Sequence, residues 1–159
     1  MPVDLSDLSA ADAGEVLTLQ RAAYVTEAQA HADPRLPPLL ESLEALRADL
    51  EDPAVVALGA RDRGRLVGAV RLRRDPEDPE AAELRRLAVA PDRQGEGIGT
   101  RLLRAAEARA PAGVTAIKLF TGEHSSGNIR LYTRHGYRET HRAPAGTHAL
   151  VFFEKALSG

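Results

Sequence analysis

The part of the sequence that most clearly suggests a binding function is a glycine-rich stretch, Asp92–Arg101 (DRQGEGIGTR). Its three glycines follow an apolar run and precede a run with helical spacing. Glycine lets a ligand approach the backbone without a Cβ in the way, and the free N–H groups and dipole at a helix start attract anions. Arg93 and Arg101 flank the glycines and can pair with phosphates. The stretch predicts a phosphate-binding turn, although a turn that only caps the helix would have the same composition.

Two common nucleotide-binding motifs do not fit this stretch. Counted from Gly95, the spacing G-x-G-x-x-G ends on Thr100 instead of a third glycine, and counted from Gly97 it ends on Leu102. A P-loop needs a lysine before its Ser or Thr, and the stretch contains no lysine. A nucleotide-binding α/β protein is therefore disfavoured.

The segment LAVAPDRQGEGIGTRLL instead resembles the acyl-coenzyme-A binding motif Q/R-x-x-G-x-G/A of the GNAT family of N-acetyltransferases. Downstream, NIRLYTRHGYRE is similar to a second family segment, N-x-x-x-x-Y-x-x-x-G-F/Y, and HALVFFEKAL is similar to the closing strand. The matching residues are Gln94, Gly97, Gly99, Asn128, Tyr132, Gly136 and Tyr137. The resemblance covers nearly the whole chain. It implies an α/β fold with a mixed, mostly antiparallel twisted sheet, splayed at its centre and flanked by helices, with acyl-CoA bound in the split.

This resemblance also implies direct transfer of an acetyl group from acetyl-CoA to a primary amine in a ternary complex. Backbone N–H groups of the glycine turn would hold the pyrophosphate, and those of the preceding strand would hold the pantetheine arm and the thioester carbonyl, an oxyanion-type role. The coenzyme residues so implied are Leu87, Ala88, Val89, Arg93, Gln94, Gly95, Glu96, Gly97, Ile98, Gly99, Thr100, Arg101, Asn128 and Tyr132. Glu96 departs from the family, which often has a basic residue there, so we expect weaker coenzyme affinity rather than loss.

Within the resemblance, Tyr132 is the candidate acid for the leaving thiolate, because a tyrosine pKa near 10 is close to that of an alkyl thiol. The alternative is a half-buried tyrosine with a purely structural hydrogen bond. Glu83 is the candidate base, acting through water, and its alternative is an edge charge paired with Arg85 or Arg73. Strict strand alternation puts Glu83, Arg85, Leu87 and Val89 on one face, and a bulge of the kind common in the family would reset that phase.

The acceptor site is the least specified part of the prediction. In the family, the segment between the first two helices commonly lines the acceptor pocket, and here its polar candidates include Tyr24, Glu27 and Glu41. Acidic groups there would attract an ammonium ion, while a solvated helix–loop–helix surface is the alternative for each residue. A small-molecule amine is favoured and a peptide amine is a second option. A homodimer is compatible with the family.

The elements that must position these residues follow from periodicity. Helices are predicted over 9–32, 39–52, 98–113 and 125–136, and strands over 54–62, 65–74, 81–90, 114–122, 137–144 and 147–157, with an acidic loop at 75–80. A further short strand before the first helix is an open option. The sheet should begin antiparallel and contain one β-α-β crossover.

Composition limits the function classes. The chain has 159 residues, net charge −2, 43% hydrophobic and 28% charged residues and no cysteine, which predicts one domain over 1–159 and excludes disulfides and a cysteine nucleophile. Nothing in the charge demands nucleic acid, and no apolar run could span a membrane. The five histidines, His31, His124, His135, His141 and His148, lack metal-ligand spacing, so no metal is predicted. The acidic N-terminus does not resemble a signal peptide, which predicts a cytoplasmic protein.

Two function classes remain after this reading. The first is an acetyl-CoA-dependent N-acetyltransferase, and the second is a non-catalytic acyl-CoA-binding or regulatory module on the same fold. Tyr132 favours the enzyme, because binding alone does not need an acid matched to a thiol.

Overall fold

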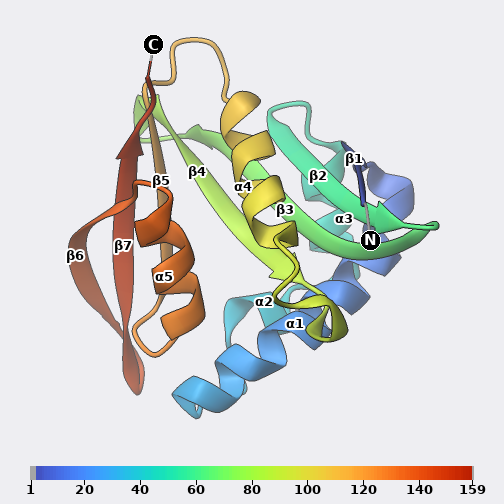
Figure 1. The fold of residues 1–159 in the computed structure, drawn as a ribbon, viewed down its shortest axis with the longest axis horizontal. Helices are drawn as coiled ribbons and strands as arrows, with labels where there is room; N and C mark the ends of the chain where they lie inside the picture. The colour runs from blue at the N-terminus through green and yellow to red at the C-terminus, as the bar shows by residue number, and fades with distance from the viewer. Residues whose placement is uncertain (1–2, 159) are drawn as a thin grey trace.

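The computed structural model describes residues 3–158 and contains a seven-stranded sheet with the order β1-β2-β3-β4-β5-β7-β6 (Figure 1). Neighbouring strands are antiparallel except for the parallel pair β4 and β5. The strands are β1 (Asp4–Asp7), β2 (Val55–Asp62), β3 (Arg65–Asp75), β4 (Asp78–Val89), β5 (Ala116–Gly122), β6 (Arg138–Ala145) and β7 (His148–Ala156). The helices are α1 (Ala13–His31), α2 (Pro37–Leu40), α3 (Leu43–Glu51), α4 (Ile98–Ala108) and α5 (Ser126–Arg134), and 3-10 turns lie at Ala10–Asp12 and Pro91–Arg93.

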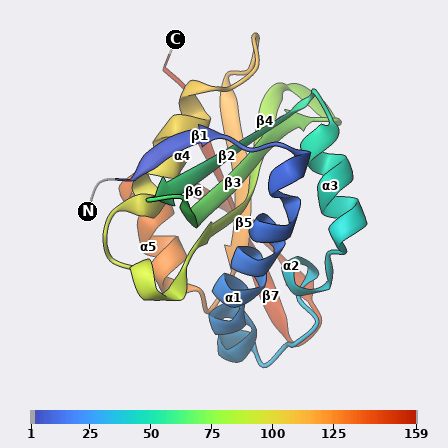
Figure 2. The same cartoon turned by 90° about the vertical axis from the view of Figure 1, so that its right-hand side faces the viewer.

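Helices cover both faces of the sheet. α1 and α3 pack on one face of β2–β4, and α4 packs on the other (Figures 1 and 2). Fully buried leucines from all three layers, among them Leu46 of α3, Leu72 of β3 and Leu102 of α4, form the core between them. None of the helices within residues 3–158 is both long and apolar enough to cross a membrane.

Several predicted boundaries were wrong, among them the end of the helix predicted over 98–113, which lies at Ala108. The predicted acidic loop at 75–80 is a tight hairpin turn, because Asp75 pairs with Asp78 in the ladder and each carboxylate accepts a backbone N–H two residues ahead. The helix predicted over 39–52 is α3, and it begins at Leu43 because the Ser42 side chain caps it by accepting the N–H of Ala45. The preceding residues form the separate short helix α2.

The sheet divides between its two parallel strands. β4 pairs with β5 only where Ala81–Glu83 faces Ala116–Lys118, and beyond Glu83 the two strands diverge (Figure 1). The outer edge of β4 from Leu84 to Val89 therefore has no strand on that side. This is the central splay expected from the family resemblance, and it leaves backbone N–H groups of β4 available to a ligand. The carbonyls of Leu87 and Val89 accept hydrogen bonds from Tyr24 and Gln94.

A β-bulge at Arg86 distorts β4 where the split opens. Arg71 pairs with Arg85 but Ala69 pairs with Ala88, so two steps along β3 correspond to three along β4, and Arg86 has a φ of 58°. The extra residue reverses the alternation after it. Val89 consequently faces Gly99 of α4, 3.8 Å from the position of a Cβ there, and does not share a face with Glu83. Strict alternation was wrong for this reason.

Candidate active site

The first of two adjoining cavities, of about 380 Å³, lies beside the unpaired edge of β4. It is bounded by the end of β4, the glycine turn, the start of α4, the middle of α1 and the segment entering α5. The predicted coenzyme residues that line it are Leu87, Ala88, Val89, Arg93, Gln94, Gly95, Gly97, Ile98, Gly99, Thr100 and Asn128. The turn, the strand edge and α5 therefore meet around one space.

The glycine turn has the geometry of an anion site. Gly95 and Gly97 have φ values of 77° and 83°, and no heavy atom lies within 4 Å of a Cβ built on either, so backbone conformation and not packing requires glycine. In the described part of the chain, no backbone N–H from Gln94 to Thr100 donates a hydrogen bond to the protein. These donors and the dipole of α4 create a local positive potential at the cavity.

The sequence suggests that Arg93 and Arg101 pair with phosphates and that Glu96 weakens coenzyme binding, but in the structure all three side chains bond to other parts of the protein. The Glu96 carboxylate folds back onto Arg93, which donates to it through Nε at 3.0 Å, and Arg93 also pairs with Asp62 at 2.9 Å. The hydrogen bond from Arg93 lowers the pKa of Glu96. Arg101 donates to the carbonyl of Val3 at 2.8 Å, away from the turn. The negative charge of Glu96 is thus compensated, at the expense of free charge on Arg93.

Arg134 is a cation at this cavity that sequence reasoning missed. It is exposed, lines the cavity and forms no ion pair within residues 3–158. Asn128, Leu131 and Arg134 are spaced by three along α5 and all line the cavity, as residues on one helical face do. That spacing from the matched Asn128 was the available signal.

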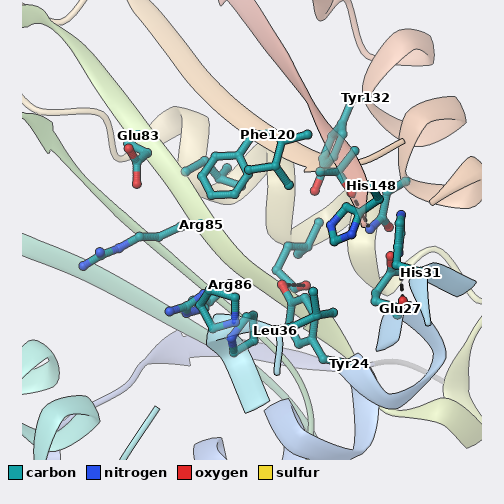
Figure 3. Close-up of a pocket in the computed structure, with 18 residues that line it drawn as sticks. Tyr24, Glu27, His31, Leu36, Glu83, Arg85, Arg86, Phe120, Tyr132 and His148 are labelled. Carbon is teal, nitrogen blue, oxygen red and sulfur yellow. Dashed lines mark hydrogen bonds between the residues drawn. The ribbon is translucent and has the colours of Figure 1, made fainter. Parts of the chain in front are cut away.

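The second cavity, of about 250 Å³, continues from the first toward β5 and β7 (Figure 3). Tyr24, Glu27, Leu87 and Asn128 line both cavities and mark their junction. The remaining walls combine apolar and ionisable groups: His31, Leu36, Pro37, Pro38, Glu83, Leu84, Arg85, Arg86, Phe120, Thr121, Gly122, Tyr132, His148 and Leu150.

Tyr132 comes from α5 and lines the second cavity. The residue is only 4% exposed, and its ring packs near those of Tyr137 and Phe153, with centroids 5.8 and 6.1 Å away. Burial raises the pKa of the Tyr132 hydroxyl above its ordinary value, and the charges of Tyr24 and Glu27 add to the effect. The hydroxyl is therefore protonated, and can donate, over the whole neutral range.

The α1 residues at the junction are held by β4 and by the residue that precedes α5. The Tyr24 hydroxyl donates to the carbonyl of Leu87 at 3.1 Å, and burial raises the pKa of Tyr24 to about 12. The Glu27 carboxylate accepts a hydrogen bond from the hydroxyl of Ser125. Burial raises the pKa of Glu27, with His31 opposing the shift. α1 thus places one phenol and one carboxylate where the two cavities join.

The other two predicted carboxylates lie in different surroundings. Glu83 lines the second cavity, across Phe120 from Tyr132 (Figure 3). Glu41 accepts hydrogen bonds from Arg71 Nη2 at 2.8 Å and Gln20 Nε2 at 2.9 Å. Burial alone would raise the pKa of Glu41, but these hydrogen bonds and the nearby arginines outweigh it and lower the pKa to about 2. Glu41 is therefore an internal counter-ion.

Three histidines distant in the sequence gather around His31: His148 lines the second cavity with it, and His124 lines the first. His31 donates from Nδ1 to the carbonyl of Glu27 at 2.8 Å, and its Nε2 accepts the backbone N–H of His124 at 3.0 Å. The rings of His31 and His148 are 4.5 Å apart, and His148 Nδ1 is buried without a partner. Among residues 3–158, no three His, Cys, Asp or Glu side chains are placed to hold a metal ion. Sequence spacing gave no signal for this cluster, because only tertiary folding brings it together.

Comparison with known proteins agrees with this geometry. The profile of the acetyltransferase (GNAT) family matches residues 16–137. The chain is 34% identical over 113 residues to the IAA acetyltransferase of Azospirillum brasilense, a match that covers 68% of this chain and 72% of the relative. The chain belongs to the GNAT acetyltransferase family.

Solved structures with the GNAT fold match nearly the whole chain. The PaiA N-acetyltransferase of Thermoplasma acidophilum, in complex with coenzyme A, superposes with a TM-score of 0.78 at 22% identity and covers 99% of this chain and 100% of its own. A putative acyl-CoA N-acyltransferase of Klebsiella pneumoniae has a TM-score of 0.70 at 28% identity, with 98% of each chain covered. The predicted fold class is confirmed.

Proposed function

We propose that this protein is an N-acetyltransferase that moves an acetyl group from acetyl-CoA to a primary amine by direct attack in a ternary complex. The observation that carries the proposal is the pair of joined cavities, with an anion-binding helix terminus at one and a buried, protonated tyrosine in the other. Family membership and a relative in complex with coenzyme A support it.

Acetyl-CoA would occupy the first cavity. The free N–H groups from Gln94 to Thr100 bind the pyrophosphate, and Arg134 supplies a positive charge near it. The edge of β4 at Leu87–Val89 binds the pantetheine arm, and Asn128 contacts it from α5. This places the thioester at the junction of the cavities, where Tyr24 and Glu27 lie.

The chemistry then needs three proton transfers. The neutral amine attacks the thioester carbonyl carbon, a C–N bond forms, and the C–S bond breaks as the tetrahedral adduct collapses. Tyr132 donates its hydroxyl proton to the departing sulfur, so that CoA leaves as the thiol. Before the attack, Glu27 holds the acceptor ammonium at the junction and Glu83 takes one of its protons through water. The cationic nitrogen of the adduct then loses a second proton, which restores the Tyr132 hydroxyl.

A small acceptor suits the second cavity better than a peptide. Its volume of about 250 Å³ equals that of roughly eight water molecules at about 30 Å³ each, which is enough for a metabolite-sized amine. The curated relative is named for a small molecule, IAA, which agrees with this size class.

The test is a calorimetric titration with acetyl-CoA and CoA, followed by a thiol-release assay over a panel of amines. The proposal predicts binding of both coenzyme forms and turnover on small primary amines. Binding of both without turnover on any amine would favour the non-catalytic acyl-CoA-binding module. No binding of either would contradict the assignment of the glycine turn as a pyrophosphate site.

A further inference from the structure

Arg86 occupies an unusual position in the second cavity. Its backbone is in the left-handed region at the bulge, with a φ of 58°, and its side chain lines the cavity wall (Figure 3). A non-glycine residue in this region is strained unless its surroundings impose the conformation. Arg86 is the extra residue of the bulge, and this places its guanidinium at the cavity in which an acceptor would bind.

The guanidinium of Arg86 is incompletely paired. Its contact with a carboxylate is through Nε, 3.4 Å from Glu41 Oε1, and within residues 3–158 it has no other ion pair. Arg71, by comparison, makes short contacts of 2.8 Å with both Glu41 and Asp49. Arginine has five N–H donors in a planar fork that matches a carboxylate, and most of those of Arg86 remain available.

Charge is also unbalanced around it. The connected ion pairs contain the guanidinium groups of Arg71, Arg85 and Arg86 against the carboxylates of Glu41 and Asp49, three cations against two anions. Glu83 lines the same cavity but forms no ion pair in the described part of the chain. The side chain of Arg86 is only 22% exposed, and a partly buried cation without a full counter-charge is unfavourable. An anionic group on a ligand would accept hydrogen bonds from the unused N–H donors of Arg86 and would balance the excess positive charge.

We infer that the acceptor carries an anionic group, a carboxylate or a similar oxyanion, which binds to Arg86 while its amine is directed to the junction of the cavities. The substrate class is then a small amino acid or related amino-carboxylate. This inference rests on the proposed function and adds the chemical class of the acceptor to it.

The rest of the cavity is compatible with such a molecule. Arg86 directly precedes Leu87, which lines both cavities, so a carboxylate on Arg86 lies close to the junction where Glu27 would attract the ammonium group. Phe120, which is 43% exposed, and Leu36 provide an apolar surface for a side chain. Opposite charges at two points of the cavity and an apolar wall between them match a zwitterion with an apolar substituent.

The experiment compares acceptors matched in size and shape, in which a carboxylate is replaced by a neutral amide, and each kcat/KM is referred to the concentration of the neutral amine. Thiol release from acetyl-CoA is measured with leucine and leucinamide, phenylalanine and phenylalaninamide, and 4-aminobutyrate and 4-aminobutyramide. We expect kcat/KM to be about 10- to 100-fold higher for the carboxylate of at least one pair, the range for one charge-assisted hydrogen bond. Arg86→Met should remove that preference and Arg86→Lys should restore part of it. Arg47→Met, at an exposed arginine of α3 outside both cavities, should leave it unchanged.

The outcomes separate this inference from the function it rests on. Equal rates within every pair, or a preference for the amides, would overturn the inference and leave the acetyltransferase in place. The same holds if Arg86→Met binds acetyl-CoA normally and keeps the wild-type preference. Absence of turnover on every amine would overturn the proposed function and this inference with it. Because the wild-type preference is measured first, the test does not depend on the folding of any variant.

Discussion

The buried charge network around Glu41 makes a quantitative prediction about acid stability. The pKa of Glu41 is lowered from 4.5 to about 2 by Arg71, Gln20 and Arg86 against the opposing effect of burial. A group with a depressed folded-state pKa stabilises the fold above its unfolded-state pKa, and that stability is lost as pH falls through the folded-state value. A shift of roughly 2.5 pKa units corresponds to at most about 3.4 kcal/mol, and partial solvation of the network reduces this to about 2 kcal/mol.

Urea unfolding of the wild type and of Glu41→Gln at several pH values measures this contribution. At pH 7 the variant should be less stable by about 2 kcal/mol. The difference should shrink to below about 1 kcal/mol at pH 3, because Glu41 of the unfolded chain, with its ordinary pKa of 4.5, is then mostly protonated while the folded-state carboxylate stays mostly ionised. The contributions of all other carboxylates to the free energy of unfolding are the same in both proteins and cancel in the difference. Glu44→Gln, at an exposed carboxylate in the first turn of α3, is the control and should show no such dependence. A difference that stays constant from pH 7 to pH 3 would refute the reasoning.

Three further predictions concern the site. Glu27→Gln should mainly raise KM for the acceptor, whereas Glu83→Gln should lower kcat about 100-fold; reversed effects, measured by steady-state kinetics, would exchange the two roles. Arg134→Met should weaken CoA binding about tenfold by calorimetry, the effect of one charge-assisted phosphate contact. Gly122→Ala should destabilise the protein by about 2 kcal/mol in urea, because its Cβ would lie 2.3 Å from Nε2 of the buried His31 ring.

Two of these variants have matched controls. Gly14→Ala, near the start of α1, adds the same methyl group with no heavy atom within 4 Å and should be neutral or stabilising. Arg130→Met removes an exposed arginine of α5 that lines neither cavity and should leave CoA affinity unchanged. Equal losses in variant and control would show that the named contacts are not responsible.

Local chemistry explains which parts of the site were predictable from the sequence. The glycine turn and the Asn128–Tyr132 segment each need particular residues at fixed spacing, since backbone donors and a helix face must point into one space. The motif residues of these two segments that do line the two cavities are Gln94, Gly97, Gly99, Asn128 and Tyr132. The antiparallel start of the sheet and its one β-α-β crossover also followed from the sequence, whereas the position of β7 between β5 and β6 did not.

The remaining features depend on contacts that spacing does not encode. The bulge was anticipated only as an option, and its place at Arg86 is set by the ladder with β3. Glu41 seemed available to an acceptor because Arg71, thirty residues away, cannot be seen to pair with it before folding. His31 and His148 meet for the same reason, and no local pattern links them.

The most direct test of the central claim compares wild type with Tyr132→Phe for acetyl-CoA affinity and for turnover on the best amine. The account predicts unchanged affinity, a fall in kcat of about 100-fold or more from loss of the general acid, and no alkaline decline in wild-type kcat below about pH 10 from a hydroxyl whose pKa is raised by burial. Unchanged kcat in the variant, with acetyl-CoA still bound, would contradict the role of Tyr132 as the acid.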